Sequence, residues 1–377
     1  MPTPPELWTA QRRNIVSSFA VGILNARQVT ELMNEGIITE CRVKPEASSL
    51  DLTVDGGVAW ELVHGVVKPE AHTSHQDILA NSRLATRVLF EDRGIVVPAK
   101  KSFVFRMNER LLLDQPLYAH ATGKSSIGRL DVLARLIADG QAKYDQIDPP
   151  FNGALYVEVT PLTFPILVRP NDSICQLRIF KGHPSRSRLR GTDLALYCRA
   201  IRNAEDPEEL RVTVALADVP QEQQAAAFKA KPTSTPIAIG APKDSVNPED
   251  YWELISPKDG GIQIVGGAFY IFRSVERFRL PQDIAVYAEA MHESLGEMRI
   301  HYAGFVHPHF GASRLDGTPL IFEVRGHDVD VFLKENEVLA KLQYFKMSEA
   351  AEPPKDQSYE EQELKLSKQF RPWRTKR

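Results

Sequence analysis

A short run of hydroxyl and basic side chains is the first candidate for chemistry in this sequence. Residues 122–129 read Thr-Gly-Lys-Ser-Ser-Ile-Gly-Arg and bring together Lys124, Ser125, Ser126 and Arg129. Hydroxyl and backbone N–H groups can surround phosphate oxygens, and a guanidinium adds a two-pronged charge-assisted contact. A P-loop would also end in Gly-Lys-Ser, but it requires glycine at position 118, which is tyrosine. We therefore predict a different kind of phosphate-binding loop, with a capped helix start as the alternative.

A glutamate within an apolar strand is the second candidate. Glu158 stands in Ala-Leu-Tyr-Val-Glu-Val, where ionising a buried carboxylate is costly unless something compensates it. Burial would raise its pKa, which suits a general base that works near neutral pH. The alternative is an outward-facing residue of an alternating strand. Glu323 holds the same place in Pro-Leu-Ile-Phe-Glu-Val, and this recurrence favours a function for both.

The two glutamates belong to a longer internal repeat. Matching segments follow one another in the same order: 105–110 with 272–277, 126–129 with 294–297, 147–151 with 306–310, 155–159 with 320–324, 166–171 with 331–336, and 177–180 with 342–345. A conserved order of this kind predicts a duplicated structural unit.

Short strands separated by Pro, Asn, Asp and Gly are predicted within the first unit, over 102–106, 153–159, 166–169 and 174–180. They predict an antiparallel barrel or sandwich. Helices are expected at Ala26–Glu35, opened by Asn25 and stopped by Gly36, and at Asp131–Ala138.

The predicted organisation has four parts. Residues 1–206 form repeat 1, 207–242 a solvent-exposed linker rich in Glu, Gln, Ala and Pro, 243–347 repeat 2, and 348–377 a tail that is mobile until something holds it.

Composition and charge narrow the class of protein. The chain has 377 residues, 43% of them hydrophobic, and a net charge of −3, so no global basic field favours nucleic acid as a partner. Three distant cysteines disfavour a disulfide framework and a cysteine zinc site. The sequence lacks an apolar leader and a membrane-spanning run, so we expect a cytoplasmic protein with no membrane contact.

Taken together, these motifs resemble the dCTP deaminase family, relatives of the trimeric dUTP diphosphatases. The resemblance covers most of residues 20–182 and, more faintly, 245–370. It rests on segments in the family's order: Ile23–Gly36, Ser48–Leu52, Gly123–Arg129, Ile147–Gly153 and Glu158. It implies a mainly β chain of two tandem dUTPase-like distorted β-barrels of the β-clip type with a few short helices. The implied reaction converts dCTP to dUTP and ammonia.

The resemblance also implies roles for single residues. Lys124, Ser125, Ser126 and Arg129 would hold the triphosphate, and the strand glutamate would take a proton from the water that attacks C4 of cytosine. Asp148 would face the sugar, or would simply be a turn residue before proline. Tyr359 and Gln362 resemble the family's C-terminal lid.

Metal chemistry is expected only through the substrate. Mg²⁺ would bridge triphosphate oxygens. No zinc is expected, because the chain has neither the His-x-Glu nor the Pro-Cys-x-x-Cys of the zinc deaminases. His301, His307 and His309 are interpreted as ordinary polar residues, so no protein metal site is predicted.

The two copies differ in ways that leave the active one open. Copy one has Tyr144 and Asp145 where the family has small residues that admit the base, whereas copy two has Ala303 and Gly304. Copy two in turn has Glu297 in place of Arg129, and His307 in place of the sugar-binding Asp. Family sites combine two subunits, so one hypothesis is a composite site of the copy-one loop with Ala303, Gly304 and Glu323. The simpler hypothesis places everything in copy one, with Glu158 as the base.

Alternative functions remain open at this stage. The same barrel serves dUTP diphosphatases and bifunctional enzymes, and the losses at Glu297 and at Tyr144 and Asp145 would also suit a non-catalytic nucleotide sensor. Inhibition by dTTP and a homo-oligomer, either trimer or dimer, are family expectations.

Overall fold

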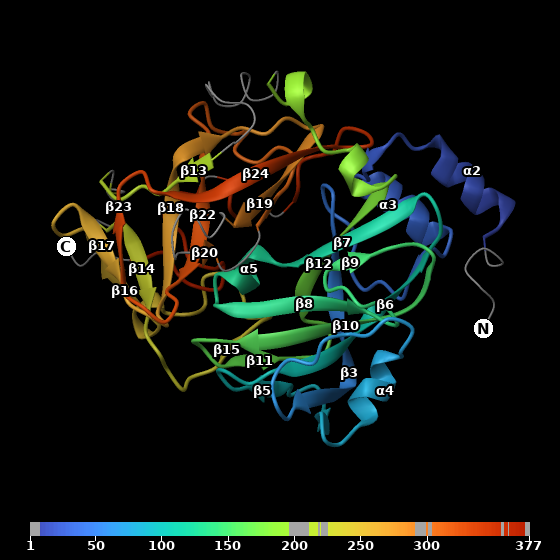
Figure 1. Cartoon of the computed structure of the whole chain (residues 1–377), viewed down its shortest axis with the longest axis horizontal. Coiled ribbons are helices and arrows are strands. Elements are labelled where there is room, and N and C mark those ends of the chain that lie inside the picture. The colour runs from blue at the N-terminus through green and yellow to red at the C-terminus, as the bar shows by residue number, and fades with distance from the viewer. Residues whose placement is uncertain are drawn as a thin grey trace.

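Antiparallel strands are the main regular structure in the computed structural model, with short helices at its edges (Figure 1). The structure describes residues 8–195, 211–217, 219, 225–290, 299–300, 304–355, 358–360 and 362–373. The predicted mainly β class is therefore confirmed. None of the helices within these ranges is long and apolar enough to cross a membrane.

The first repeat is built around one large, strongly curved sheet. Its strands run in the order β8-β10-β6-β3-β12-β7-β9, with β1, β2 and β4 attached at its sides. Its elements in the described residues are α2 Ala10–Ser18, β1 Gly22–Ile23, α3 Ala26–Asn34, β2 Ile38–Thr39, β3 Leu50–Leu62, α4 His75–Ala80, β4 Ala85–Phe90, β5 Ile95–Val97, β6 Phe103–Leu113, β7 Leu117–Gly123, α5 Ser125–Gly128, β8 Val132–Ala138, β9 Gln146–Ile147, β10 Phe151–Pro161, β11 Ile166–Val168 and β12 Ser173–Lys181.

The second repeat reproduces the pairings of the first. β18 pairs with β22 as β6 does with β10, β19 with β24 as β7 does with β12, and β17 with β23 as β5 does with β11. Its described strands are β13 Arg211–Thr213, β14 Ala227–Ala230, β15 Ile237–Ala238, β16 Trp252–Ile255, β17 Gly261–Ile264, β18 Phe269–Phe278, β19 Ile284–Ala290, β20 Arg299–Ile300, β21 Phe305–Val306, β22 Thr318–Arg325, β23 Val331–Lys334 and β24 Val338–Lys346.

The duplication extends to individual hydrogen bonds. In repeat 1, Glu109 accepts from the backbone N–H of Thr53 at 2.9 Å and from its hydroxyl at 2.7 Å. In repeat 2, Glu276 accepts from the backbone N–H of Thr213 at 2.8 Å and from its hydroxyl at 2.9 Å. The glutamates occupy matching places in the repeated segments 105–110 and 272–277, so one structural unit has been copied along with its buried polar contacts.

The predicted first helix is present as α3. The side chain of Asn25 accepts from the backbone of Gln28 while the side chain of Gln28 accepts from the backbone of Asn25, which forms a capping box. Gly36 ends the segment with φ +67°, a conformation that glycine adopts without strain.

The predicted helix at Asp131–Ala138 is wrong, because the segment forms β8 and pairs with β10. Its apolar residues are buried on both faces of the strand, so their spacing does not distinguish strand from helix. The expected exposed linker also differs from the structure. Strands β13, β14 and β15 lie within 207–242, and Phe228 of β14 is buried in the core. The residue boundaries of the four parts stay predictions.

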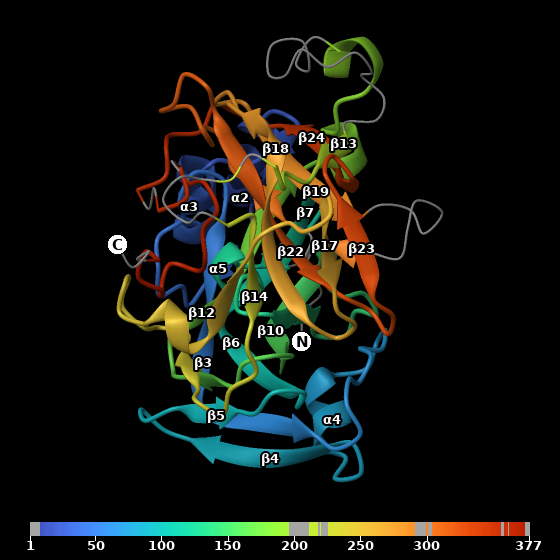
Figure 2. The ribbon, with the colours of Figure 1, turned by 90° about the vertical axis from the view of Figure 1, so that its left-hand side faces the viewer.

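The two repeats lie side by side (Figure 1), and Figure 2 views the molecule from the side of repeat 2, with β18 and β22 toward the viewer. The C-terminal segment bonds to both repeats, since Gln362 accepts from Arg129 and donates to the carbonyl of Pro319. Leu364, Leu366 and Phe370 are buried in an apolar cluster that joins the core of repeat 1 to Trp252 and Phe269 of repeat 2. The ring of Phe370 packs against those of Tyr251 and Trp252, at 5.6 and 6.0 Å between centroids. The expectation of a mobile tail is thus wrong for the described residues of this segment, because scattered apolar side chains find pockets formed by distant parts of the chain.

Candidate active site

A cavity of about 450 Å³ lies between the two repeats. Repeat 1 contributes the loop after β7 and the start of β8, and repeat 2 contributes β21 and β22. The C-terminal segment closes one side. The residues that matter for the site are Lys124, Ser125, Gly128, Arg129, Gly304, Phe305, His307, Glu323, Tyr359 and Gln362. The structure therefore brings together, within one chain, most residues of the composite hypothesis.

The loop after β7 places a buried arginine at the floor of this cavity. β7 ends at Gly123, the single turn α5 follows, and Arg129 is the C-cap of α5. Arg129 donates from Nη2 to Oε1 of Gln362 at 2.8 Å and from Nη1 to the carbonyl of Lys365 at 3.1 Å. The centroid of the Tyr359 ring lies 4.1 Å from the guanidinium carbon of Arg129. These contacts leave Arg129 with 4% of its surface exposed.

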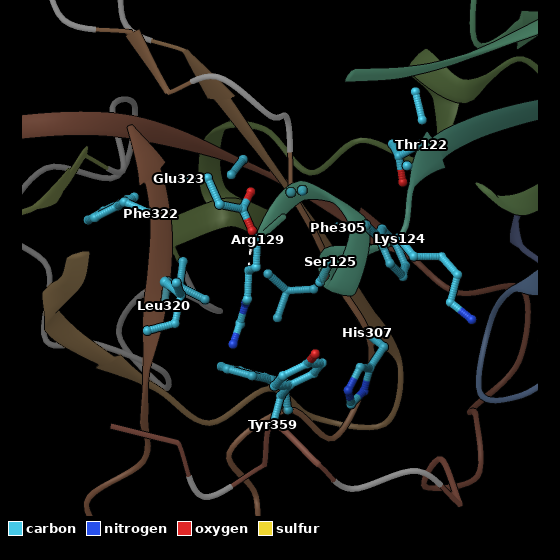
Figure 3. A pocket seen from close by; sticks show the side chains of 18 of the residues that line it. Thr122, Lys124, Ser125, Arg129, Phe305, His307, Leu320, Phe322, Glu323 and Tyr359 are labelled. Carbon is cyan, nitrogen blue, oxygen red and sulfur yellow. Dashed lines mark ion pairs between the residues drawn. The ribbon is translucent and has the colours of Figure 1, made fainter. Parts of the chain in front are cut away.

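Glu323 is the acidic partner of this arginine. It lies on β22, opposite Ile271 of β18, and its Oε1 is 3.8 Å from Nε of Arg129 (Figure 3). Burial raises the pKa of Glu323 to about 8; the charge of Arg129 lowers it in part and that of Asp131 raises it. A carboxyl group with such a pKa can both accept and return a proton near neutral pH.

Close backbone approach makes room for this carboxylate. A Cβ atom added at Gly128 would lie 2.9 Å from Oε2 of Glu323 and 3.1 Å from its Cδ. Glycine at position 128 therefore lets the loop of repeat 1 approach the strand of repeat 2.

A second cavity of about 470 Å³ adjoins the first, and both are lined by Lys124, Ser125, Phe305, His307 and Tyr359. The amine of Lys124 extends away from Glu323 and pairs with Asp51. Ser126 is buried, and its carbonyl accepts from the hydroxyl of Ser367 in the C-terminal segment at 2.7 Å. Lys124 and Ser125 thus lie where the two cavities meet, and Ser126 lines the second cavity.

Repeat 2 supplies the wall opposite the loop. Gly304 and Phe305 line the cavity, and His307 follows them with its Nε2 3.3 Å from Oε1 of Glu360. Ala303, His301 and Glu297 lie outside the described residues, so the predictions for them stay predictions. His309 bonds instead to the carbonyl of Ala351.

The corresponding place in repeat 1 is closed. Glu158 has 2% of its surface exposed, and it does not line either cavity. The hydroxyl of Tyr144 lies 3.5 Å from Oε2 of Glu158 and also bonds to the carbonyl of Val67 at 3.2 Å. Burial raises the pKa of Glu158 to about 7. The tyrosine that differs from the family pattern therefore fills the space beside this carboxylate.

Asp148 is also apart from the cavities. Its carboxylate pairs with Lys143 at 3.2 Å, and 48% of its side chain is exposed. In the composite arrangement, His307 holds the corresponding position and does line the Glu323 cavity.

Sequence reasoning missed two charged residues next to the site, Asp131 and Arg325. Each stands two positions after a predicted site residue, Arg129 or Glu323, and they form an ion pair between the repeats. Asp131 has φ +57°. Their spacing from the predicted residues was the signal available in the sequence.

Comparisons with known proteins agree with this arrangement. A family model for the N-terminal domain of 2'-deoxycytidine 5'-triphosphate deaminase matches residues 20–183, and a model for the C-terminal domain matches residues 190–370. A protein from Methanothermobacter thermautotrophicus named "dCTP deaminase, dUMP-forming" is 26% identical over 184 residues, which cover 44% of this chain and 87% of that protein. The crystal structure of 2'-deoxycytidine 5'-triphosphate deaminase from Agrobacterium tumefaciens superposes with a TM-score of 0.80 and 26% identity, over 88% of this chain and 97% of the other.

Proposed function

The chain belongs to the dCTP deaminase family, and we propose that it hydrolyses dCTP to dUTP and ammonia at the cavity between its repeats. One observation carries the location of the site. The buried carboxylate of Glu323 lies beside Arg129 in a cavity that the C-terminal segment covers, whereas Glu158 lines neither of the two described cavities.

Glu323 is the general base of the proposed reaction. Its ionised carboxylate removes a proton from water as the oxygen of that water bonds to C4 of cytosine. The carboxyl group then returns the proton to the amino nitrogen, the C4–N bond breaks, and ammonia leaves. The proton that remains on the oxygen at C4 moves to N3 of the ring, so that C4 becomes the carbonyl carbon of uracil. Arg129 favours the ionised carboxylate by its charge, and its bonds to Gln362 and to the carbonyl of Lys365 fix its direction.

The proposed position of Arg129 revises its expected role. Its described contacts are with Glu323, Tyr359 and the C-terminal segment, which favours a role at the base over one at the phosphates. Lys124 and Ser125 line the neighbouring cavity and stay our candidates for the triphosphate. We expect Mg²⁺ to enter with the nucleotide as part of the substrate.

The test compares the two glutamates. Glu323→Gln should lower kcat for ammonia release from dCTP by about 10²–10⁴-fold, the usual contribution of a general base. Glu158→Gln is the matched control, since it makes the same change at the repeated position, and it should keep kcat within a few fold. Full activity of Glu323→Gln together with loss of activity in Glu158→Gln would overturn the composite site.

Release of diphosphate as well is our second candidate function. The Methanothermobacter relative is named as dUMP-forming, so its reaction with dCTP includes removal of diphosphate. Ammonia and diphosphate measured in parallel, with dCTP and with dUTP as substrate, separate the two functions. Equal amounts of both products from dCTP would identify a bifunctional enzyme. Tight nucleotide binding without either product would instead identify a sensor.

A further inference from the structure

Two ion pairs connect the repeats beside the cavity, and the repeat that supplies the cation differs between them. In the first, the cation is Arg129 of repeat 1 and the anion is Glu323 of repeat 2. In the second, two positions further along both segments, the anion is Asp131 of repeat 1 and the cation is Arg325 of repeat 2. Residues two apart on a strand share a face, so Glu323 and Arg325 both face the loop of repeat 1.

The second pair is buried and held by further bonds. Asp131 has no exposed surface in its side chain, and 18% of the Arg325 side chain is exposed. The hydroxyl of Thr163 donates to Asp131, and Nη1 of Arg325 lies 3.2 Å from the same hydroxyl. The carbonyl of Asp131 accepts from the backbone of Leu162 at 2.9 Å. Breaking a buried pair of this kind leaves an uncompensated charge, so both partners matter for the local geometry.

The closed position in repeat 1 has no such pair. Two residues after Glu158, on the same strand, stands Thr160, whose hydroxyl shares a hydrogen bond with Ser102 at 2.7 Å. The strand arginine thus accompanies the glutamate that faces a cavity and is missing beside the glutamate that does not.

We propose that Asp131 and Arg325 are a positioning pair for Glu323. They hold the strand and the loop in register so that Arg129 meets the carboxylate, and they balance the charge around it. This inference rests on the proposed function of Glu323 as the base. In the described residues, the charged groups that face Glu323 are Arg129 and Asp131 from the loop and Arg325 from its own strand, with the Tyr359 ring of the C-terminal segment against Arg129.

Removing the charge of Asp131 and removing the charge of Arg325 should shift the pH dependence of kcat/KM in opposite directions. Asp131→Asn leaves the charge of Arg325 uncompensated, favours ionised Glu323, and should shift the acidic limb of kcat/KM for dCTP to lower pH. Arg325→Met removes the cation paired with Asp131 and should shift the same limb to higher pH. Each shift is expected to be on the order of one pH unit, because each variant removes one unit charge close to Glu323. The double variant should return close to the wild-type limb, with a lower kcat.

Two further variants separate positioning from simple stability. Arg325→Lys keeps the charge, so the acidic limb of kcat/KM should stay at the same pH even if kcat falls. Thr163→Val removes a hydroxyl that contacts both Asp131 and Arg325 but removes no charge. It should therefore lower the melting temperature without shifting the acidic limb of kcat/KM. Shifts in the same direction for both single variants, or unmoved limbs in folded proteins, would overturn the pair's role. The failure of the proposed function has a different signature, namely a Glu323→Gln variant that still deaminates dCTP.

Discussion

The guanidinium of Arg129 lies against the carboxylate of Glu323, with 3.8 Å between Nε and Oε1, although the two residues come from different repeats. Each repeat thus supplies one half of a charged pair.

The rate of deamination should rise with pH. A general base must be ionised, and burial raises the pKa of Glu323 to about 8, so the base is mostly protonated below that value. We expect kcat/KM for dCTP to increase from pH 6 and to level off above about pH 8. A profile of kcat/KM against pH for the wild type measures this, and a profile that is flat between pH 6 and 9 would contradict it.

The same carboxyl group should make the protein less stable as pH rises. The pKa of Glu323 is raised on folding, so its favourable contribution is complete below pH 4.5 and is lost as pH rises through about 8. The glutamine of Glu323→Gln does not titrate. The free energy of unfolding of this variant, relative to that of the wild type, should therefore increase by several kcal/mol between pH 5 and 9, since one pKa unit corresponds to about 1.4 kcal/mol. Denaturant unfolding at a series of pH values checks the trend. A difference that stays constant with pH would contradict the burial of the carboxyl group.

A methyl group at position 128 should disturb the pair directly. Gly128→Ala would place Cβ 2.9 Å from Oε2 of Glu323, so the carboxylate must move away. We expect kcat to fall at least about tenfold, which corresponds to about 1.4 kcal/mol in the barrier. Gly123→Ala is the comparison, because its Cβ would meet Ala134 at an ordinary 3.5 Å, and its loss should be much smaller. Equal effects of the two changes would argue against the close approach.

The C-terminal segment should loosen when the packing of Phe370 is removed. Phe370 packs between Tyr251 and Trp252, and Phe→Ala changes in cores typically destabilise by about 3–5 kcal/mol. Phe370→Ala should therefore raise KM for dCTP several fold and speed tryptic cleavage after Lys368. Leu315→Ala is the control, because 92% of Leu315 is exposed. Unchanged cleavage in Phe370→Ala would show that other contacts suffice to hold the segment.

A buried histidine in repeat 1 predicts acid sensitivity. Neither ring nitrogen of His75 has a partner among the described residues, and burial lowers its pKa to about 4. The unfolded chain takes up a proton near pH 6.5 and the folded one does not, so stability is lost as pH falls from 6.5 to 4. His75→Phe should remove this loss, which amounts to about 3 kcal/mol. Unfolding curves of both proteins at pH 7.5 and 4.5 measure it, and parallel changes would contradict the prediction.

The sequence predicted features that depend on local pattern or on repetition. The helix at α3 followed from its capping residues, and the equivalence of Glu158 and Glu323 followed from the repeat, since they face Val104 and Ile271 at matching positions of β6 and β18. The composite arrangement followed from comparing the copies. Tyr144 fills the space beside Glu158, as its size in the sequence suggested.

Features that depend on distant contacts could not be predicted in this way. The apolar residues of β8 fit a helix or a strand equally well until β10 is placed beside them. The burial of Leu364, Leu366 and Phe370 depends on surfaces formed more than a hundred residues away. The hydroxyl and basic residues of loop 122–129 predict that Arg129 contacts phosphate. Only the position of β22 beside this loop shows that Arg129 contacts Glu323.

Covalent connection of the two repeats has a consequence for how the enzyme works at low abundance. Because Arg129 and Glu323 are parts of one polypeptide, their encounter does not depend on how many molecules are present. A contact between separate subunits would be lost on dilution, whereas the contact of Arg129 with Glu323 forms within one folded chain. The rate per molecule should then stay constant as the enzyme is diluted, even where any oligomer dissociates.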